Sequence, residues 1–142
     1  MEKNTGIEIP KQQIYKEMQI WTGTFLGGPL VAGYMLAENF KAFNEAENAK
    51  KTWYYSVAAS VLLWVIAFSL PATIPIPNQL LPLVMGSVAY YFAQQYQGEH
   101  IKKHINSRGK FCNWFGAIAI AVLFAIPQLV VIILLFPYLF TK

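Results

Sequence analysis

Aspartate is missing from this chain, and cysteine occurs only once, as Cys112. Without Asp there is no Ser-His-Asp set, and a single cysteine excludes both an intramolecular disulfide and a Cys-based metal cluster. The seven acidic residues are all Glu, and none lies deep inside an apolar segment, where a proton carrier would work. A Gly-rich phosphate loop ending in Lys-Ser or Lys-Thr is absent as well. We therefore expect no enzyme activity and no cofactor.

Charged residues are scarce too, at 13%, whereas 56% of residues are hydrophobic and the mean hydropathy is +0.38. In soluble proteins roughly a quarter of residues are charged. The apolar residues form four runs, at 20–37, 53–70, 80–93 and 114–140. At about 1.5 Å per helical residue, most of these runs can cross a hydrocarbon core of about 30 Å. The sequence predicts one all-α membrane domain over residues 1–142, a bundle of four transmembrane helices after a polar, interfacial segment at 1–19.

Positive charge gives this bundle an orientation. Two basic loops, at 38–52 and 94–113, hold most of the Lys and Arg residues, and further lysines precede the first run. With four spans and both basic loops in the cytoplasm, seven of the eleven positive residues lie inside and four outside. If the first run is re-entrant instead, ten lie inside and only Lys142 outside. Four spans are the prediction, and the re-entrant alternative stays open.

The first run is rich in glycine and contains Pro29. Glycines four apart, such as Gly23 and Gly27, remove side chains from one helix face and let another backbone approach closely. Pro29 removes a backbone donor and should bend or break the helix just before it. We interpret the run as a tightly packed, kinked helix, and the alternative is a broken helix that lines a site, as in transporters.

A short motif recurs along the chain. The sequence Pro-Leu-Val-Ala-Gly at 29–33 is repeated as Pro-Leu-Val-Met-Gly at 82–86. A basic segment follows each copy, and then a tryptophan, Trp53 or Trp114, that opens the next apolar run. These features suggest two parallel helix-loop-helix repeats related by an axis along the membrane normal. The predicted helix-packing residues are Gly23, Gly27, Gly28, Gly33 and Gly86.

Few polar side chains are candidates for chemistry. Gln128 lies near the middle of the fourth run, where an interhelical hydrogen bond is its expected role. His100 and His104 are four apart, so a helix places both imidazoles on one face, which is the spacing of a two-histidine metal site. The sequence places no third ligand beside them. We therefore expect a solvated amphipathic helix and no metal.

The stretch 25–34, Phe-Leu-Gly-Gly-Pro-Leu-Val-Ala-Gly-Tyr, is followed by Asn-Phe-Lys-Ala-Phe at 39–43. This pattern resembles one found in small bacterial integral membrane proteins of uncharacterised function. The region from His100 to Trp114 is similar to the same group. The resemblance implies a short helical protein of the bacterial inner membrane. It implies no activity and no binding residues.

Together these features predict a non-catalytic interaction or structural subunit that packs through its glycine-rich helix faces. Its expected partners are the lipid bilayer and either a second copy or another membrane protein, and nucleic acid is not among them. The alternative is a small oligomeric transporter or channel made from the two repeats. In that case Pro29, Pro82 and Gln128 would lie near its pathway.

Overall fold

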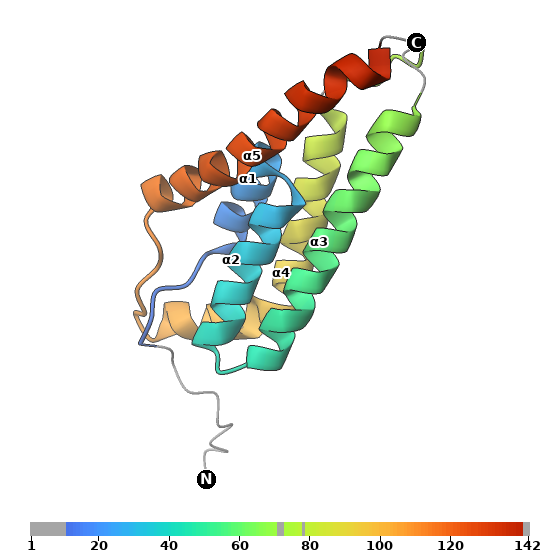
Figure 1. Cartoon of the computed structure of the whole chain (residues 1–142). Helices are drawn as coiled ribbons and strands as arrows, with labels where there is room; N and C mark the ends of the chain where they lie inside the picture. Colours follow the sequence, from blue (N-terminus) through green and yellow to red (C-terminus); the bar gives the residue numbers. More distant parts are fainter. Residues whose placement is uncertain (1–10, 71–72, 78, 141–142) are drawn as a thin grey trace.

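The computed structural model describes residues 11–70, 73–77 and 79–140. Regular structure in these residues is helical, apart from one isolated bridge between Ile14 and Phe111. Along this part of the chain the helices are α1 (Glu17–Gly27), α2 (Pro29–Ala42), α3 (Ala46–Ser69), α4 (Leu80–Asn106) and α5 (Trp114–Phe140) (Figure 1). The described part of the protein is thus all-helical, as the sequence predicted.

The first apolar run forms two helices instead of one. α1 ends at Gly27, α2 begins at Pro29, and the chain reverses direction between them (Figure 1). Proline suits the first position of a helix, where no backbone donor is needed. Gly28 has φ +79° and ψ −173°, a conformation that is essentially restricted to glycine. The single helix expected at 20–37 is therefore divided, and we call residues 17–42 the hairpin.

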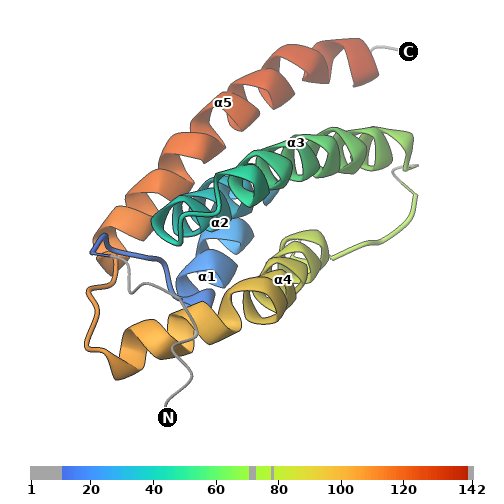
Figure 2. The same ribbon diagram turned by 90° about the horizontal axis from the view of Figure 1, so that it is seen from below.

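The other three helices surround the hairpin. α3 packs along α2, whereas α4 and α5 pack mainly against α1. Figure 2 shows α3, α4 and α5 at separate places around it. Within the described residues, extensive packing between any two of these outer helices is absent. The three outer helices are therefore held in place mainly through their contacts with the hairpin.

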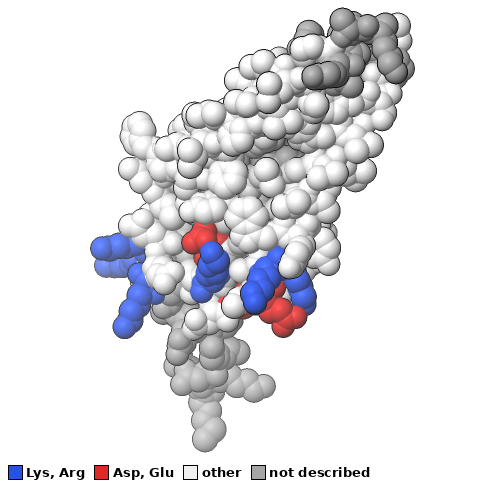
Figure 3. Space-filling model, viewed as in Figure 1, with Lys and Arg blue, Asp and Glu red and all other residues white. Residues whose placement is uncertain are grey.

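The charged side chains gather at one end of the molecule. In Figure 3 the coloured side chains lie at the end where α2 is followed by α3, and the remainder of the visible described surface is uncharged. The helices continue into this end: α3 begins at Ala46 and α4 ends only at Asn106. The segments 38–52 and 94–113 were predicted as loops, but they are largely helical. They are rich in Ala, Glu, Gln and Lys, which are good helix formers.

α2 and α4 end at this charged end in the same way. Asn44 and Arg108 follow the two helices in the left-handed conformation, with φ of 62° and 55°. The next N–H in each case bonds back to the last turn, Glu45 to the Phe40 carbonyl and Gly109 to the His104 carbonyl, both at 2.8 Å. This hydrogen bond is typical of helix C-termini that close with a left-handed residue.

Two helices, α3 and α5, are long and apolar enough to cross a membrane. Most of their side chains are exposed, and none of the α5 side chains described beyond Gln128 is buried. α4 has 27 residues, but its second half is polar. Composition and length therefore mark two candidate spans, and α4 matches them in length alone.

The two units proposed as repeats share a direction but differ in packing. α2 with α3, and α4 with α5, each run toward the charged end and back (Figure 1). α3 packs closely on α2, whereas α5 packs on α1 instead of α4. α2 also has 14 residues against 27 in α4. The two units are therefore not equivalent in the described structure.

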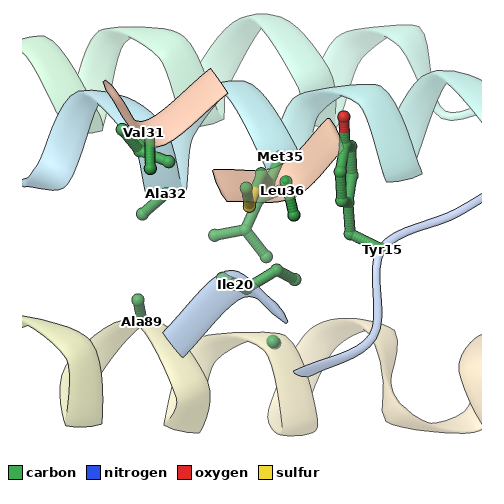
Figure 4. Packing of buried hydrophobic residues seen from close by; sticks show 10 residues of the cluster. Tyr15, Ile20, Val31, Ala32, Met35, Leu36 and Ala89 are labelled. Carbon is green, nitrogen blue, oxygen red and sulfur yellow. The ribbon is translucent and has the colours of Figure 1, made fainter. Parts of the chain in front are cut away.

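The hairpin also supplies seven of the fifteen buried hydrophobic residues of the described core. Figure 4 shows Ile20 of α1 directed toward Met35 and Leu36 of α2, with Ala89 of α4 alongside. Ile20 and Met35 are fully buried. The run at 20–37, which the sequence predicted to be a tightly packed, kinked helix, is well buried here, because the other helices cover it.

Candidate functional site

The turn of the hairpin is closed by a side chain from α5. Gln128 Nε2 donates to the Gly27 carbonyl at 2.7 Å and to the Phe124 carbonyl at 3.0 Å. The Gly28 N–H donates to the Thr24 carbonyl at 2.8 Å. Carbonyl groups at the end of a helix lack partners within it, and buried ones must find them elsewhere. Gln128 supplies such a partner for α1.

The predicted packing glycines lie at contacts inside the chain. A β-carbon built on Gly27 would lie 2.6 Å from the Ala121 carbonyl oxygen of α5, so only glycine allows the two backbones to come this close. The others follow the same pattern: Gly23 lies against Met35, Gly28 against Gln128, Gly33 against Ser56 and Gly86 against Trp21. These glycines therefore permit close contacts within the chain, between the hairpin helices and with their neighbours.

A cluster of buried amides joins the two ends of the hairpin at its base. The Tyr15 N–H donates to Asn39 Oδ1 at 2.7 Å, and Asn39 Nδ2 donates to the Tyr15 carbonyl and to Gln97 Oε1, both at 2.9 Å. Gln97 Nε2 donates in turn to the Leu36 carbonyl at 2.9 Å. Asn39 and Gln97 are both fully buried. We call Asn39, Gln97 and the Tyr15 backbone the amide cluster.

A second buried amide holds the segment that leads into α5. Gln19 Nε2 donates to the Cys112 carbonyl at 2.7 Å, and Gln19 Oε1 accepts from the Lys16 N–H at 2.9 Å. Burial raises the pKa of the Cys112 thiol above its usual range, and burial likewise raises the pKa of the neighbouring Tyr15 phenol. Both groups therefore stay protonated at neutral pH, so Cys112 is a poor nucleophile.

The two histidines have separate partners. His100 Nε2 lies 3.2 Å from Glu45 Oε1, and its ring stacks on Phe43. His104 is buried instead of solvated, with Nε2 2.8 Å from the Lys110 carbonyl. Among the described residues no three His, Cys, Asp or Glu side chains come together to hold a metal ion.

A groove of about 600 Å³ lies between α3 and α4, and residues of α2 also line it. Its lining includes small side chains, among them Ala32, Ala59 and Ala89. At the charged end the lining turns polar, with Asn48, Lys51 and Thr52. We call this cavity the lateral groove. Sequence reasoning did not find it.

The residues proposed for a pathway do not share a cavity. Pro29 lines the lateral groove, whereas Pro82 is half-buried in α4 and does not line it. Gln128 is engaged at the hairpin turn. In the described structure these three side chains therefore do not form one site.

The sequence contained a signal for the buried residues of α4. All of them except Gly98 recur at helical spacing: Gly86, Ala89, Ala93, Gln97, Ile101 and His104. This periodicity continues through the basic segment, where it indicates both a longer helix and the burial of Gln97 and His104. Asn39 had no comparable signal, because its partner lies 24 residues away.

Comparison with known protein families, curated proteins and solved structures finds no match to this chain. The geometry described above is therefore the basis for assigning a function.

Proposed function

We propose that this is a bacterial inner-membrane protein in which α3, α4 and α5 span the bilayer around a re-entrant hairpin. The hairpin helices have 11 and 14 residues. At about 1.5 Å per residue, neither can cross a hydrocarbon core of about 30 Å. Non-helical backbone is tolerated at membrane depth where protein surrounds it, and the turn at Gly28 has neighbours of this kind in Gln128 and α5.

The charge distribution supports a cytoplasmic location for the charged end. With a re-entrant hairpin, ten of the eleven Lys and Arg residues fall on the side of this end, and Lys142 alone follows α5. Short loops with an excess of Lys and Arg stay in the cytoplasm. A four-span arrangement would place seven Lys and Arg residues inside and four outside, which is a smaller asymmetry. The resemblance to small bacterial membrane proteins agrees with this location.

Cysteine labelling distinguishes a topology with three membrane spans and a re-entrant hairpin from one with four spans. In a Cys112→Ser background, single cysteines at Lys11, Asn44 and Ser107 should all be protected from a membrane-impermeant maleimide in intact cells. A cysteine at Thr73 should be labelled, because the α3–α4 connection lies on the other side. Permeabilised cells, in which all four positions should react, serve as the control. Labelling of Lys11 together with Thr73 would contradict the hairpin and restore four spans.

We infer further that the protein is a non-catalytic subunit that associates with a second copy of itself through α5. The observation that supports this is Gly116, an exposed helical glycine where an added β-carbon would meet no neighbouring atom within 4 Å. Glycine weakens a helix by about 1 kcal/mol relative to alanine, and no contact with the described residues requires it here. Between helices in a membrane, by contrast, glycine permits close approach. Ala119 and Leu123 continue the same exposed face.

Replacing Gly116 with leucine should weaken self-association by about tenfold or more, since the added side chain separates the two backbones. Förster transfer between labelled copies in lipid vesicles measures this directly. Ala58→Leu, a small-to-large change at an exposed position of α3, is the matched control and should leave the transfer unchanged. A chain that is monomeric before any change, or equal loss in both variants, would contradict association through α5.

Transport is the second candidate, because re-entrant helices line pathways in known transporter folds. The hairpin favours this reading, but its turn is occupied by the Gln128 amide, and Pro82 lies outside the cavity that Pro29 lines. An interaction role needs no such pathway. We therefore prefer it.

A further inference from the structure

The lateral groove changes character along its length. Away from the charged end it is lined by apolar side chains such as Met85, Val88 and Ala89 of α4. Two hydroxyl groups in its lining bond to their own helices: Thr24 Oγ1 donates to the Ile20 carbonyl and Ser56 Oγ to the Trp53 carbonyl. Because these hydroxyl groups donate within their own helices, the part of the groove away from the charged end presents a mainly apolar surface.

The charged end of the groove has the opposite chemistry. Lys51 and Tyr55 of α3 and Tyr96 of α4 line it, together with Asn48 and Glu45. Asn48 Nδ2 donates to Glu45 Oε2 at 2.6 Å, and Glu45 Oε1 lies 3.2 Å from His100 Nε2, so the amide and the carboxylate are already engaged. Lys51 pairs with Glu47, but both side chains are more than half exposed, so this pair holds the ammonium group only weakly. The Lys51 ammonium, with the hydroxyl groups of Tyr55 and Tyr96 in the same lining, suits a phosphate group.

The volume of the groove limits what can occupy it. A helix is about 10 Å across with its side chains, so a cavity of about 600 Å³ would hold less than two turns of one. The volume lies within the range of roughly 300–1,000 Å³ that is typical of small-molecule sites. Small residues such as Ala32, Ala59 and Ala89 leave space for a thin, flexible chain.

We propose that the lateral groove binds one phospholipid molecule, with its phosphate at Lys51 and an acyl chain along the small residues of α2, α3 and α4. The polar and apolar ends of the groove match the two ends of such a molecule in chemistry and order. The site rests on the proposed membrane location, and it is independent of association through α5. Lipid bound here fills the space between two helices that do not pack on each other.

Native mass spectrometry of the detergent-purified full chain with added phosphatidylglycerol tests this proposal. Lys51→Gln should lower the fraction of chain carrying one lipid by about fivefold, through loss of a charged hydrogen bond. Ala59→Phe, which fills the groove, should lower it by a similar factor or more. Glycerol phosphate, which has the phosphate but no acyl chain, should not displace the lipid.

Two controls are matched to these variants. Lys50→Gln removes the neighbouring charge, which does not line the groove, and Val61→Phe enlarges an exposed side chain on the same helix. Both should retain the lipid. Equal losses for Lys50→Gln and Lys51→Gln would overturn the proposal in favour of general attraction to the charged end. Loss of a dimer peak in Ala59→Phe without loss of lipid would overturn it in favour of a second copy in the groove. Because the same spectra report association and lipid separately, failure of one proposal is distinguishable from failure of the other.

Discussion

Gly27→Leu is expected to destabilise the fold by about 3 kcal/mol or more, as overpacking against a backbone that cannot yield. The β-carbon alone would lie 2.6 Å from the Ala121 carbonyl oxygen and 2.5 Å from a Val31 methyl group. α1 and α5 would have to move apart, and the hydrogen bond from Gln128 to the Gly27 carbonyl would be lost with them. Thermal unfolding of the detergent-solubilised protein, followed by tryptophan fluorescence, should show a large fall in Tm.

Gly116→Leu is the matched control for this experiment. It makes the same change on α5 where a β-carbon meets nothing within 4 Å. Leucine is the better helix former by nearly 1 kcal/mol, so the monomer should be equally stable or slightly more so. If Gly27→Leu unfolded at the same temperature as Gly116→Leu, the close contact between α1 and α5 would be refuted.

Asn39→Leu is expected to cost about 3–5 kcal/mol, because it leaves several buried groups without partners at once. The Tyr15 N–H, the Tyr15 carbonyl and Gln97 Oε1 would each lose the hydrogen bond described above. Leucine has the same branched outline as asparagine and is not smaller, so the loss reports on hydrogen bonding and not on a cavity. Hydrogen exchange of the Tyr15 amide should accelerate along with the fall in Tm.

Gln95→Ala removes an amide from an exposed position of α4 and should change Tm little. Asn39→Asp provides a second comparison. It keeps an acceptor for the Tyr15 N–H but loses the donor to the Tyr15 carbonyl and to Gln97, so it should also be strongly destabilising. A tolerated Asn39→Leu would mean that the base of the hairpin is held by apolar packing alone.

The sequence was sufficient to predict those features that depend on residues close together along the chain. Long apolar runs predict helices wherever they occur. α5 coincides with the run at 114–140, and α3 contains nearly all of the run at 53–70 but begins earlier, at Ala46. Pro29 interrupts a helix through its own missing donor, so a break near it was predictable. The grouping of Lys and Arg beside apolar runs is also a property of the linear chain, and it kept the re-entrant alternative open.

The boundaries in the charged segments were harder to predict, because polarity alone does not separate a loop from a helix end. α4 continues to Asn106 because its apolar stripe continues, with Gln97 and His104 in positions that hydrophobic residues would otherwise occupy. The spacing of this stripe is present in the sequence. Because Gln97 and His104 are polar, however, the stripe does not stand out as an apolar helix face. The buried amide at Gln97 is acceptable because Asn39 and the Leu36 carbonyl satisfy it.

The sequence by itself determined that this chain is helical, apolar and charged at few places, since those properties reside in composition and local periodicity. Tertiary structure alone decided that the first run folds back at Gly28, that its glycines face α2, α3 and α5, and that a groove opens between α3 and α4. These features depend on contacts between residues far apart in the chain, such as Gln128 with Gly27. A local pattern records that a glycine or an amide is present, and only the packed helices determine which partner it meets.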